Sequence, residues 1–218
     1  MKNTIESDMQ ERMENLGRKI LITARNELYM KMRFLDVALS SLPFVLDTGA
    51  EGMGTDGMYL YYDPKYLGGL FRTDRVAVNR IYLHLVLHGI FRHMIRRKGR
   101  EERLYNLACD IVTESIIDDM QHRCVLKSRP LLRREMYREL KKEMKTLTVE
   151  RVYEFLKKEQ LSENKILQLE TEFRVDDHSY WPKDEDKKKQ SQIENKWQDI
   201  SEHMETEMET FSREASQS

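Results

Sequence analysis

The sequence predicts an α+β protein that is mainly helical, with a buried metal-binding helix and a small β-hairpin. Charged residues make up 34% of the 218 residues, and Gly and Pro are scarce, which favours helices. Apolar residues recur at three- and four-residue spacing over much of the chain, whereas only two short stretches have strand character. One helical stretch is apolar on every face and carries His84 and His88.

The composition limits the expected partners and location. The net charge is -1, so no overall charge draws the chain to nucleic acid or to an acidic membrane surface. We see no apolar run of the roughly 18 residues that a membrane helix needs, and no apolar signal-peptide core. Cys109 and Cys124 are too few for a disulfide framework. We therefore expect a cytoplasmic protein with reduced thiols, no nucleic-acid partner and no membrane segment.

The N-terminal part is predicted to form two helices and then a β-hairpin. Residues 4–32 show an amphipathic pattern, and a shorter helix ends before Pro43. The stretches 44–46 and 58–62 have strand propensity, and a glycine-rich loop joins them. In zinc proteases an edge strand beside the site holds an extended peptide by strand addition, so this hairpin is a candidate support for a peptide.

A helix over residues 76–98 is predicted to lie at the centre of the fold. Apolar side chains on every face are typical of a buried helix, and the cations at 96–98 followed by Gly99 suit its C-terminal end. His84 and His88 are one turn apart, so both imidazoles point the same way and could bind one ion. A pair of hydrogen-bonded core histidines is the alternative.

The residue after His84 decides what this pair could do. Zinc proteases carry H-E-x-x-H on a helix, in which the Glu is the general base. Leu85 stands in the position of that Glu. The chain thus keeps two candidate metal ligands and lacks the usual base.

The next helix, predicted over residues 101–122, supplies a third candidate ligand. Asp110 follows the second His by 22 positions, and Glu114 shares its face beside the apolar stripe. Two His and one carboxylate leave a fourth position open for water, as in catalytic zinc sites. We therefore predict that His84, His88 and Asp110 bind one Zn²⁺ ion. His93 lies about 180° round the helix from His84, so we expect it to cap or pack instead.

The second half of the chain is more highly charged. Basic residues concentrate between 127 and 145 with three Glu among them, and a solvated helix face is favoured over a nucleic-acid patch. Thr148 is expected to cap another helix. We expect a first domain over residues 1–182, followed by residues 183–218 as a charged helical extension or a linker to a further C-terminal domain.

Several motifs occur in order over roughly residues 10 to 200. They are Gly54-Thr55-Asp56-Gly57 with Tyr61-Tyr62-Asp63-Pro64, His84-x-x-Leu87-His88-x-x-x-x-His93, Asn106-Leu107-Ala108-Cys109-Asp110, and Asp177-His178-x-x-Trp181. Through them the chain resembles the predicted metallopeptidase domain of bacterial VWA-like proteins. The resemblance implies a zincin-like α+β fold for residues 1–182 and a cytoplasmic protein. It also implies, in many members, a C-terminal von Willebrand A-like domain and a genomic link to a MoxR-type AAA+ ATPase, a candidate partner.

The chain departs from the family pattern at Leu85, where the family has Glu. Loss of a positioned acid–base group typically costs about 10²–10⁴-fold in rate, so we expect weak or no peptidase activity. Glu114 is a candidate displaced base, a fourth ligand or a hydrogen-bond partner of a ligand. His178 could reach the open metal position or stabilise an oxyanion, or it could be a surface side chain.

Three functions remain open from the sequence. The favoured one is a zincin-like, metal-binding domain that is catalytically impaired, a pseudoenzyme that binds peptide or protein segments or an AAA+ partner. The second is an active zinc-dependent peptidase that uses another base, such as Glu114. The third is a helical interaction module without a metal. The sequence names no substrate.

Overall fold

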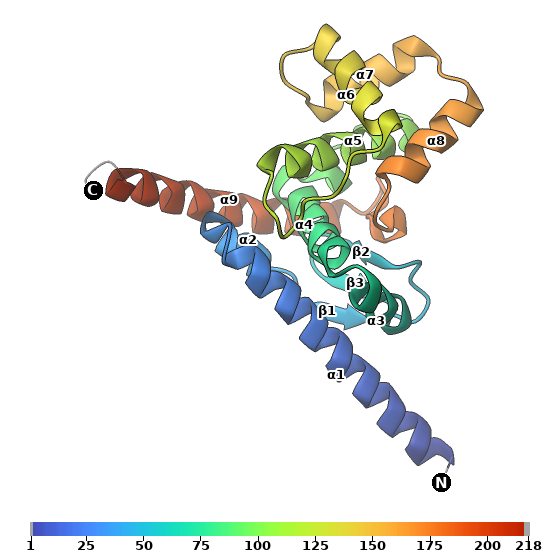
Figure 1. The fold of residues 1–218 in the computed structure, drawn as a ribbon, viewed down its shortest axis with the longest axis vertical. Helices are drawn as coiled ribbons and strands as arrows, with labels where there is room; N and C mark the ends of the chain where they lie inside the picture. Colours follow the sequence, from blue (N-terminus) through green and yellow to red (C-terminus); the bar gives the residue numbers. More distant parts are fainter. Residues whose placement is uncertain (1, 216–218) are drawn as a thin grey trace.

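The structure, a computed structural model, describes residues 2–215 (Figure 1). In chain order its elements are α1 (Lys2–Tyr29), the 3-10 turn η1 (Arg33–Leu35), α2 (Asp36–Ser40), β1 (Phe44–Leu46), β2 (Met53–Thr55), β3 (Leu60–Tyr62), α3 (Pro64–Thr73), α4 (Arg75–Phe91), η2 (His93–Ile95), α5 (Glu102–Met120), α6 (Leu131–Glu143), α7 (Val149–Glu159), α8 (Glu163–Phe173), η3 (His178–Tyr180) and α9 (Lys187–Ala215). The mainly helical α+β class predicted from the sequence is therefore confirmed.

The sheet has the strand order β1-β3-β2. β1 runs parallel to β3 with Val45 opposite Tyr61, whereas β2 runs antiparallel to β3 with Gly54 opposite Tyr61. The hairpin predicted between stretches 44–46 and 58–62 is wrong, because these two strands are parallel neighbours. The hairpin partner of β3 is β2, which lies inside the predicted loop. Asp56 makes this tight turn by accepting hydrogen bonds from the backbone N–H groups of residues 58 and 59.

The outer edge of β2 is paired with a later part of the same chain. The backbone N–H of Asp177 donates to Met53 O at 2.8 Å, and Gly54 forms a parallel bridge with Asp177. A Cβ atom on Gly54 would lie 2.5 Å from the Asp177 carbonyl oxygen, so only glycine permits this approach. A peptide could not add to β2 at these positions without displacing the segment around Asp177.

Helix α4 lies at the centre of the molecule, and its residues 77–89 are all buried. Asp74 caps its start by accepting a hydrogen bond from Ala77 N at 2.9 Å. The helix ends at Phe91, not at Lys98 as predicted. Arg92 takes the left-handed conformation with φ 56°, while its guanidinium donates to Glu194 and to Gln198 on α9. The end of α4 at Phe91 therefore coincides with contacts between Arg92 and α9, and the local sequence does not predict it.

Two apolar cores lie on either side of the α4–α5 pair. The first contains side chains from α1, α2, the sheet, α3, α4 and α9. The second is formed by α5 with α6, α7 and α8, which gather over one side of α5 in Figure 1. The seam between the two cores therefore runs along facing sides of α4 and α5.

Helix α9 shares the first core with the preceding residues. Trp197 is wholly buried, and its indole N–H donates to Gly57 O at 2.8 Å. A Cβ atom on Gly89 would lie 2.0 Å from the Trp197 ring, so α4 and α9 touch at a residue that has no side chain. The division into residues 1–182 and 183–218 stays a prediction. In the structure, side chains of α9 pack in the same core as residues before 183.

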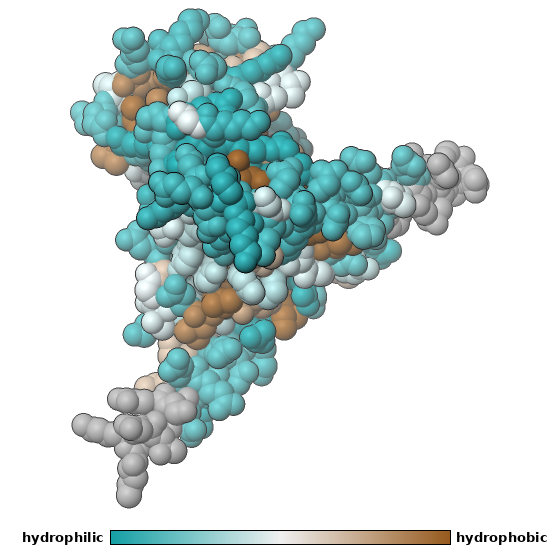
Figure 2. All heavy atoms as spheres, turned by 180° about the vertical axis from the view of Figure 1, so that it is seen from behind, coloured by the Kyte–Doolittle hydropathy of each residue, from teal (hydrophilic) through white to brown (hydrophobic). Residues whose placement is uncertain are grey.

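The surface is mostly hydrophilic on the face that Figure 2 shows, with apolar side chains in small separate patches. Among the helices of residues 2–215, none combines the length and the apolar character that a membrane span requires.

Candidate metal centre

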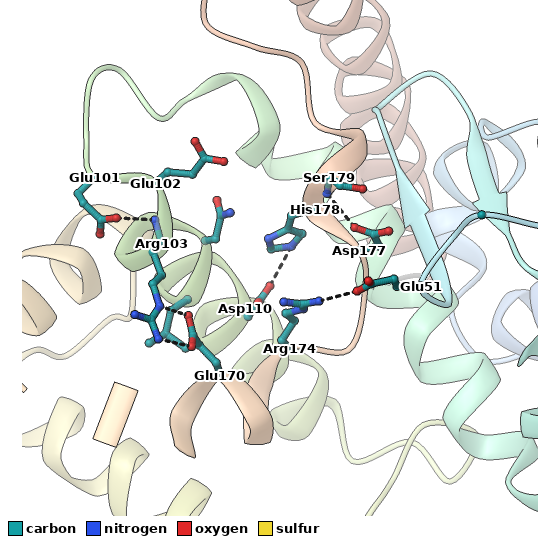
Figure 3. Close-up of a pocket in the computed structure, with 13 residues that line it drawn as sticks. Glu51, Glu101, Glu102, Arg103, Asp110, Glu170, Arg174, Asp177, His178 and Ser179 are labelled. Atoms are coloured by element: carbon teal, nitrogen blue, oxygen red, sulfur yellow. Dashed lines mark hydrogen bonds and ion pairs between the residues drawn. The ribbon is translucent and has the colours of Figure 1, made fainter. Parts of the chain in front are cut away.

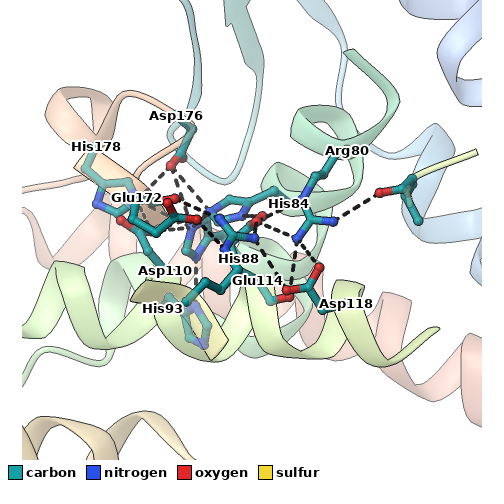
Figure 4. A network of polar contacts seen from close by, with 12 residues as sticks. Arg80, His84, His88, His93, Asp110, Glu114, Asp118, Glu172, Asp176 and His178 are labelled. Atoms are coloured by element: carbon teal, nitrogen blue, oxygen red, sulfur yellow. Dashed lines mark hydrogen bonds and ion pairs between the residues drawn. The ribbon is translucent and has the colours of Figure 1, made fainter. Parts of the chain in front are cut away.

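Five side chains converge in the seam between the two cores (Figure 4). They are His84 and His88 from α4, Asp110 from α5, and Asp176 and His178 from the segment after α8. Each offers one ligand atom, and these atoms all lie within 4.8 Å of one another. The structure thus brings together the three residues predicted as ligands, His178, which was a candidate for the open metal position, and Asp176, which the sequence did not indicate.

The helices place the first three donors by their spacing. His84 and His88 are one turn apart, and their Nε2 atoms are 2.7 Å apart. Asp110 on α5 directs Oδ1 to a point 3.4 Å from each of these nitrogens. All three side chains are at most 2% exposed, because α4 and α5 are buried along this seam.

The segment after α8 places the other two donors by extended-chain spacing. Because the backbone of Asp177 is paired with β2, residues 176 and 178 turn their side chains to the same side, towards α4 and α5. His178 Nε2 lies 3.1 Å from Asp176 Oδ1 and 3.2 Å from Asp110 Oδ1. The side chain of Asp177 instead accepts a hydrogen bond from Ser179 N.

Aromatic contacts fix this segment on the sheet. The hydroxyl of Tyr180 donates to Asp47 at 2.7 Å, and its ring stacks on Tyr61 with centroids 4.3 Å apart. The Trp181 ring stacks on the imidazole of His178 at 3.9 Å. The orientation of His178 is therefore set by neighbours on both sides.

The donor set fits a divalent metal ion. Bonds of about 2.0–2.2 Å at tetrahedral angles keep ligand atoms about 3.3–3.6 Å apart, and most of the nitrogen–oxygen distances above are close to that range. The two imidazole nitrogens, at 2.7 Å, are closer than that. Asp110 Oδ1 and both carboxylate oxygens of Asp176 are buried and accept no hydrogen bond from the described residues. Buried carboxylate oxygens without a donor are costly, and a cation would satisfy them.

Glu114 holds His84 from behind. Its Oε1 lies 3.0 Å from His84 Nδ1, and a carboxylate only accepts, so Nδ1 carries a proton and Nε2 is the ring nitrogen that would bind an ion. Its Oε2 accepts hydrogen bonds from Arg80 and from Arg133, each at 2.6 Å. Asp118 adds a second carboxylate to Arg80 at 2.8 Å. Both oxygens of Glu114 therefore have partners, and neither is available as a ligand at the centre.

His93 contacts the centre from outside. Because the chain turns at Arg92, His93 folds back and its Nδ1 lies 2.7 Å from Nδ1 of His88. Its own carbonyl accepts the hydroxyl hydrogen of Tyr105 at 2.9 Å. His93 therefore packs beside a donor and lies outside the converging set, as the sequence predicted.

The electrostatics of the five donors suit a cation. Burial opposes the charged form of His178, but the carboxylates of Asp110 and Asp176 outweigh it and raise its pKa to about 10. Burial disfavours ionised Asp110 and Asp176, yet the charge of His178 beside them holds both pKa values below the usual range. Burial, with the charge of His84, lowers the pKa of His88 to about 4. Two ionised carboxylates therefore face the centre at neutral pH, and His178 would release its proton when its imidazole binds an ion.

Two neighbouring cavities, which share Glu51 and Arg174 in their lining, reach the centre. One of about 650 Å³ is lined by Asp110 and His178 and opens between α5 and the segment after α8 (Figure 3). The other, of about 570 Å³, is lined by Asp176 and Glu114. Leu85 lines neither cavity and is wholly buried in the first apolar core.

The fold and the converging donors define a mainly helical domain with a buried site suited to a metal ion. A family model described as a putative metallopeptidase domain matches residues 19–217, so the chain belongs to that family. No curated protein matches the chain, and no solved structure does.

The sequence did not point to Asp176. The signal that could have indicated it is the spacing of Asp176-x-His178, because residues two apart point to the same side of an extended chain. The pairing partner that makes the segment extended is Met53, more than 120 residues earlier, and no local pattern shows it.

Proposed function

We propose that the chain is a metal-binding domain that holds one zinc ion with protein ligands drawn from the five converging donors, His84, His88, Asp110, Asp176 and His178. The observation that carries the proposal is the convergence of five buried donors, three of whose carboxylate oxygens have no hydrogen-bond donor. Three imidazoles and two carboxylates suit zinc among the divalent ions. The ion would supply Lewis-acid polarisation of a carbonyl group. A zincin-like fold, with a histidine-bearing helix beside a small sheet, is part of the proposal.

We further propose that the domain hydrolyses peptides weakly or not at all. Leu85 cannot accept a proton, and its side chain lies in the apolar core. Glu114 is a poor substitute base. Burial opposes its charge, but the hydrogen bond from His84 and the charges of His84, Arg80 and Arg133 outweigh burial and lower its pKa to about 2. A general base that acts near neutral pH needs a pKa closer to 7.

We assign the domain a role in binding rather than in turnover. The candidate partners are a peptide or protein segment and a MoxR-type AAA+ ATPase in the cytoplasm, with a von Willebrand A-like domain as the neighbour in the full protein. These assignments rest on the resemblance to VWA-like proteins that the ordered motifs of the sequence carry.

Metal analysis of protein purified without added zinc tests the first proposal. We expect about one equivalent of zinc, and a large loss of zinc in Asp110→Asn, which removes a charged donor without changing the shape of the side chain. Glu139→Gln, a change on the exposed face of α6, is the matched control and should keep its zinc. Absence of metal, together with unfolding that does not respond to a chelator, would rule the site out.

A hydrolysis assay with the zinc-loaded protein and unstructured protein substrates tests the second proposal. We expect no turnover above that of Asp110→Asn. If turnover is found, Glu114→Gln separates the two enzyme hypotheses. Turnover that disappears in this variant while zinc is retained would make Glu114 the base and would overturn our assignment.

A further inference from the structure

Three hollows on the surface join into one groove over the candidate metal centre. The central hollow is the 650 Å³ cavity that reaches Asp110 and His178. On one side it shares four lining residues with a 360 Å³ hollow beside Trp181, namely Glu102, Asn106, His178 and Ser179. On the other side it shares Glu51 and Arg174 with the 570 Å³ cavity. Shared walls make these hollows successive parts of one depression, and His178 lies in its middle part.

The central hollow is acidic. Six carboxylates line it, from Glu51, Glu101, Glu102, Asp110, Glu170 and Asp177, against two guanidinium groups, from Arg103 and Arg174. The guanidinium of Arg103 is paired with Glu170 at 2.6 Å (Figure 3) and also with Glu163, so its charge is already neutralised by carboxylates. Arg174 faces Glu51 across 3.6 Å. Neither arginine is therefore a strong attractor for an anionic ligand, and the surplus of carboxylates favours a cationic one.

Two of these carboxylates are exposed to solvent and lie at opposite ends of the central hollow. The Glu51 side chain is 80% exposed and borders the 570 Å³ cavity, while the Glu102 side chain is 70% exposed and borders the hollow beside Trp181. Their partners, Arg174 and Arg97, form surface ion pairs, which typically contribute only about 0–1 kcal/mol. Both carboxylates can therefore exchange these partners for an incoming cation at low cost.

We propose that this groove binds an extended, basic segment of a partner polypeptide, with lysine or arginine side chains received by Glu51 and Glu102. The elongated shape fits a chain and not a compact small molecule, and the acidic lining selects a basic sequence. The basic segment would be a partner of the candidate metal centre. Its position over a bound metal ion rests on the proposed function. Binding itself needs only the groove.

Fluorescence anisotropy at low ionic strength tests the proposal with the zinc-bound protein. The probe is a labelled octapeptide of alternating lysine and alanine, and the comparison peptide has glutamate in place of lysine. We expect the lysine peptide to bind more tightly, with an affinity that falls as salt is added. In the double variant Glu51→Gln, Glu102→Gln, binding should weaken about three- to tenfold, the effect of losing two exposed ion pairs.

The matched control is Glu139→Gln, Glu154→Gln, which removes the same charge from exposed helix faces outside the groove. It should leave the affinity within twofold of the unaltered protein. Equal binding of the two peptides, or an equal loss in both double variants, would overturn the proposal.

Metal analysis of the same samples separates this proposal from the proposed function. Protein that holds zinc but shows no preference for the lysine peptide would overturn the groove alone. Protein without zinc that loses lysine-peptide binding only in the groove variant would overturn the metal site and support the groove.

Discussion

At residue scale, Asp176 and Asp177 show how an extended backbone assigns neighbouring side chains to different tasks. Asp176 turns to the five donors, and Asp177 caps the η3 turn. We predict that Asp176→Asn lowers zinc affinity by about 100-fold or more, because it removes a charged ligand from the buried centre. Competition with a chromophoric chelator measures the change.

Asp177→Asn is the matched control for this prediction. Asparagine keeps the side-chain oxygen that accepts from Ser179, so zinc affinity should change by less than about threefold. Equal losses in the two variants would mean that Asp176 acts through general stability and not as a ligand.

The difference between helical and strand-borne donors explains how much of the centre could be predicted. His84 and His88 could be predicted because helix geometry is local, so a spacing of four residues is enough to place two side chains together. Asp110 could be predicted as a candidate from its place beside the apolar stripe of the next helix. Asp176 was missed because its direction depends on pairing with β2, a contact between distant parts of the chain. The role of Glu114 was left open for a similar reason, since Arg80 and Arg133 reach it from α4 and α6.

At the scale of elements, the contact between α4 and α9 depends on Gly89. We predict that Gly89→Ala lowers the free energy of unfolding by about 1–3 kcal/mol, because the added methyl group overlaps the Trp197 ring. Thermal unfolding measures the loss, and a red shift of tryptophan emission should accompany it as Trp197 becomes hydrated.

Gly68→Ala in α3 is the control for this change. A Cβ atom there would meet nothing within 4 Å, so alanine should stabilise the helix by about 0.5–1 kcal/mol. A similar gain at Gly89 would show that α9 packs differently from the arrangement described above.

The attachment of α9 should also depend on pH through Lys196. Its Nζ donates to Met58 O, and burial lowers its pKa to about 8, although Asp56 offsets part of this effect. Between about pH 8 and pH 10 the unfolded chain then binds a proton that the folded chain does not, so the free energy of unfolding rises with pH. Above about pH 8 the folded form therefore holds Lys196 without its proton.

Melting temperatures of the unaltered protein and of Lys196→Met test this effect at about pH 7.5 and about pH 9.5. The variant lacks the titrating group, so the unaltered protein should gain stability relative to it as the pH rises. Parallel changes in the two proteins would show that Lys196 keeps an ordinary pKa.

Most helices and the strands β1 and β3 were predictable, whereas β2 and the pairing of the strands were not. Periodic apolar residues predicted α1 and α5, and apolar residues on every face predicted α4. Asp74 and Thr148 cap α4 and α7 by accepting backbone hydrogen bonds. β2 has only three residues, of which one is glycine, so no alternation of side chains marks it. The early end of α4 was equally hidden, because arginine has no preference for the left-handed conformation that Arg92 adopts.

At the scale of the whole molecule, the centre joins α4, α5 and the segment after α8. We predict that zinc stabilises the fold against unfolding, by about 2.7 kcal/mol when free zinc is 100 times the dissociation constant. Chelation should reverse the gain and loosen the segment that carries Asp176 and His178. Thermal unfolding with and without chelator measures the first effect.

Limited trypsin digestion measures the second effect, because Arg174 and Lys183 flank the two donors. Cleavage at these residues should speed up after chelation, while cleavage in α6 serves as an internal reference. Equal acceleration at both places would indicate global unfolding without a local release of the segment.

The hydrogen bond from Asp177 to Met53 also makes the centre tolerant of change elsewhere in the chain. It anchors the last two donors to the sheet, although the chain reaches them through α6, α7 and α8. The turn between α7 and α8, residues 160–162, is exposed or half-buried and contributes no donor. An insertion in this turn, or new chain ends made there by circular permutation, would leave the five donors in place on α4, on α5 and on the segment that pairs with β2. The domain could thus exchange the connection between these helices without rebuilding its centre.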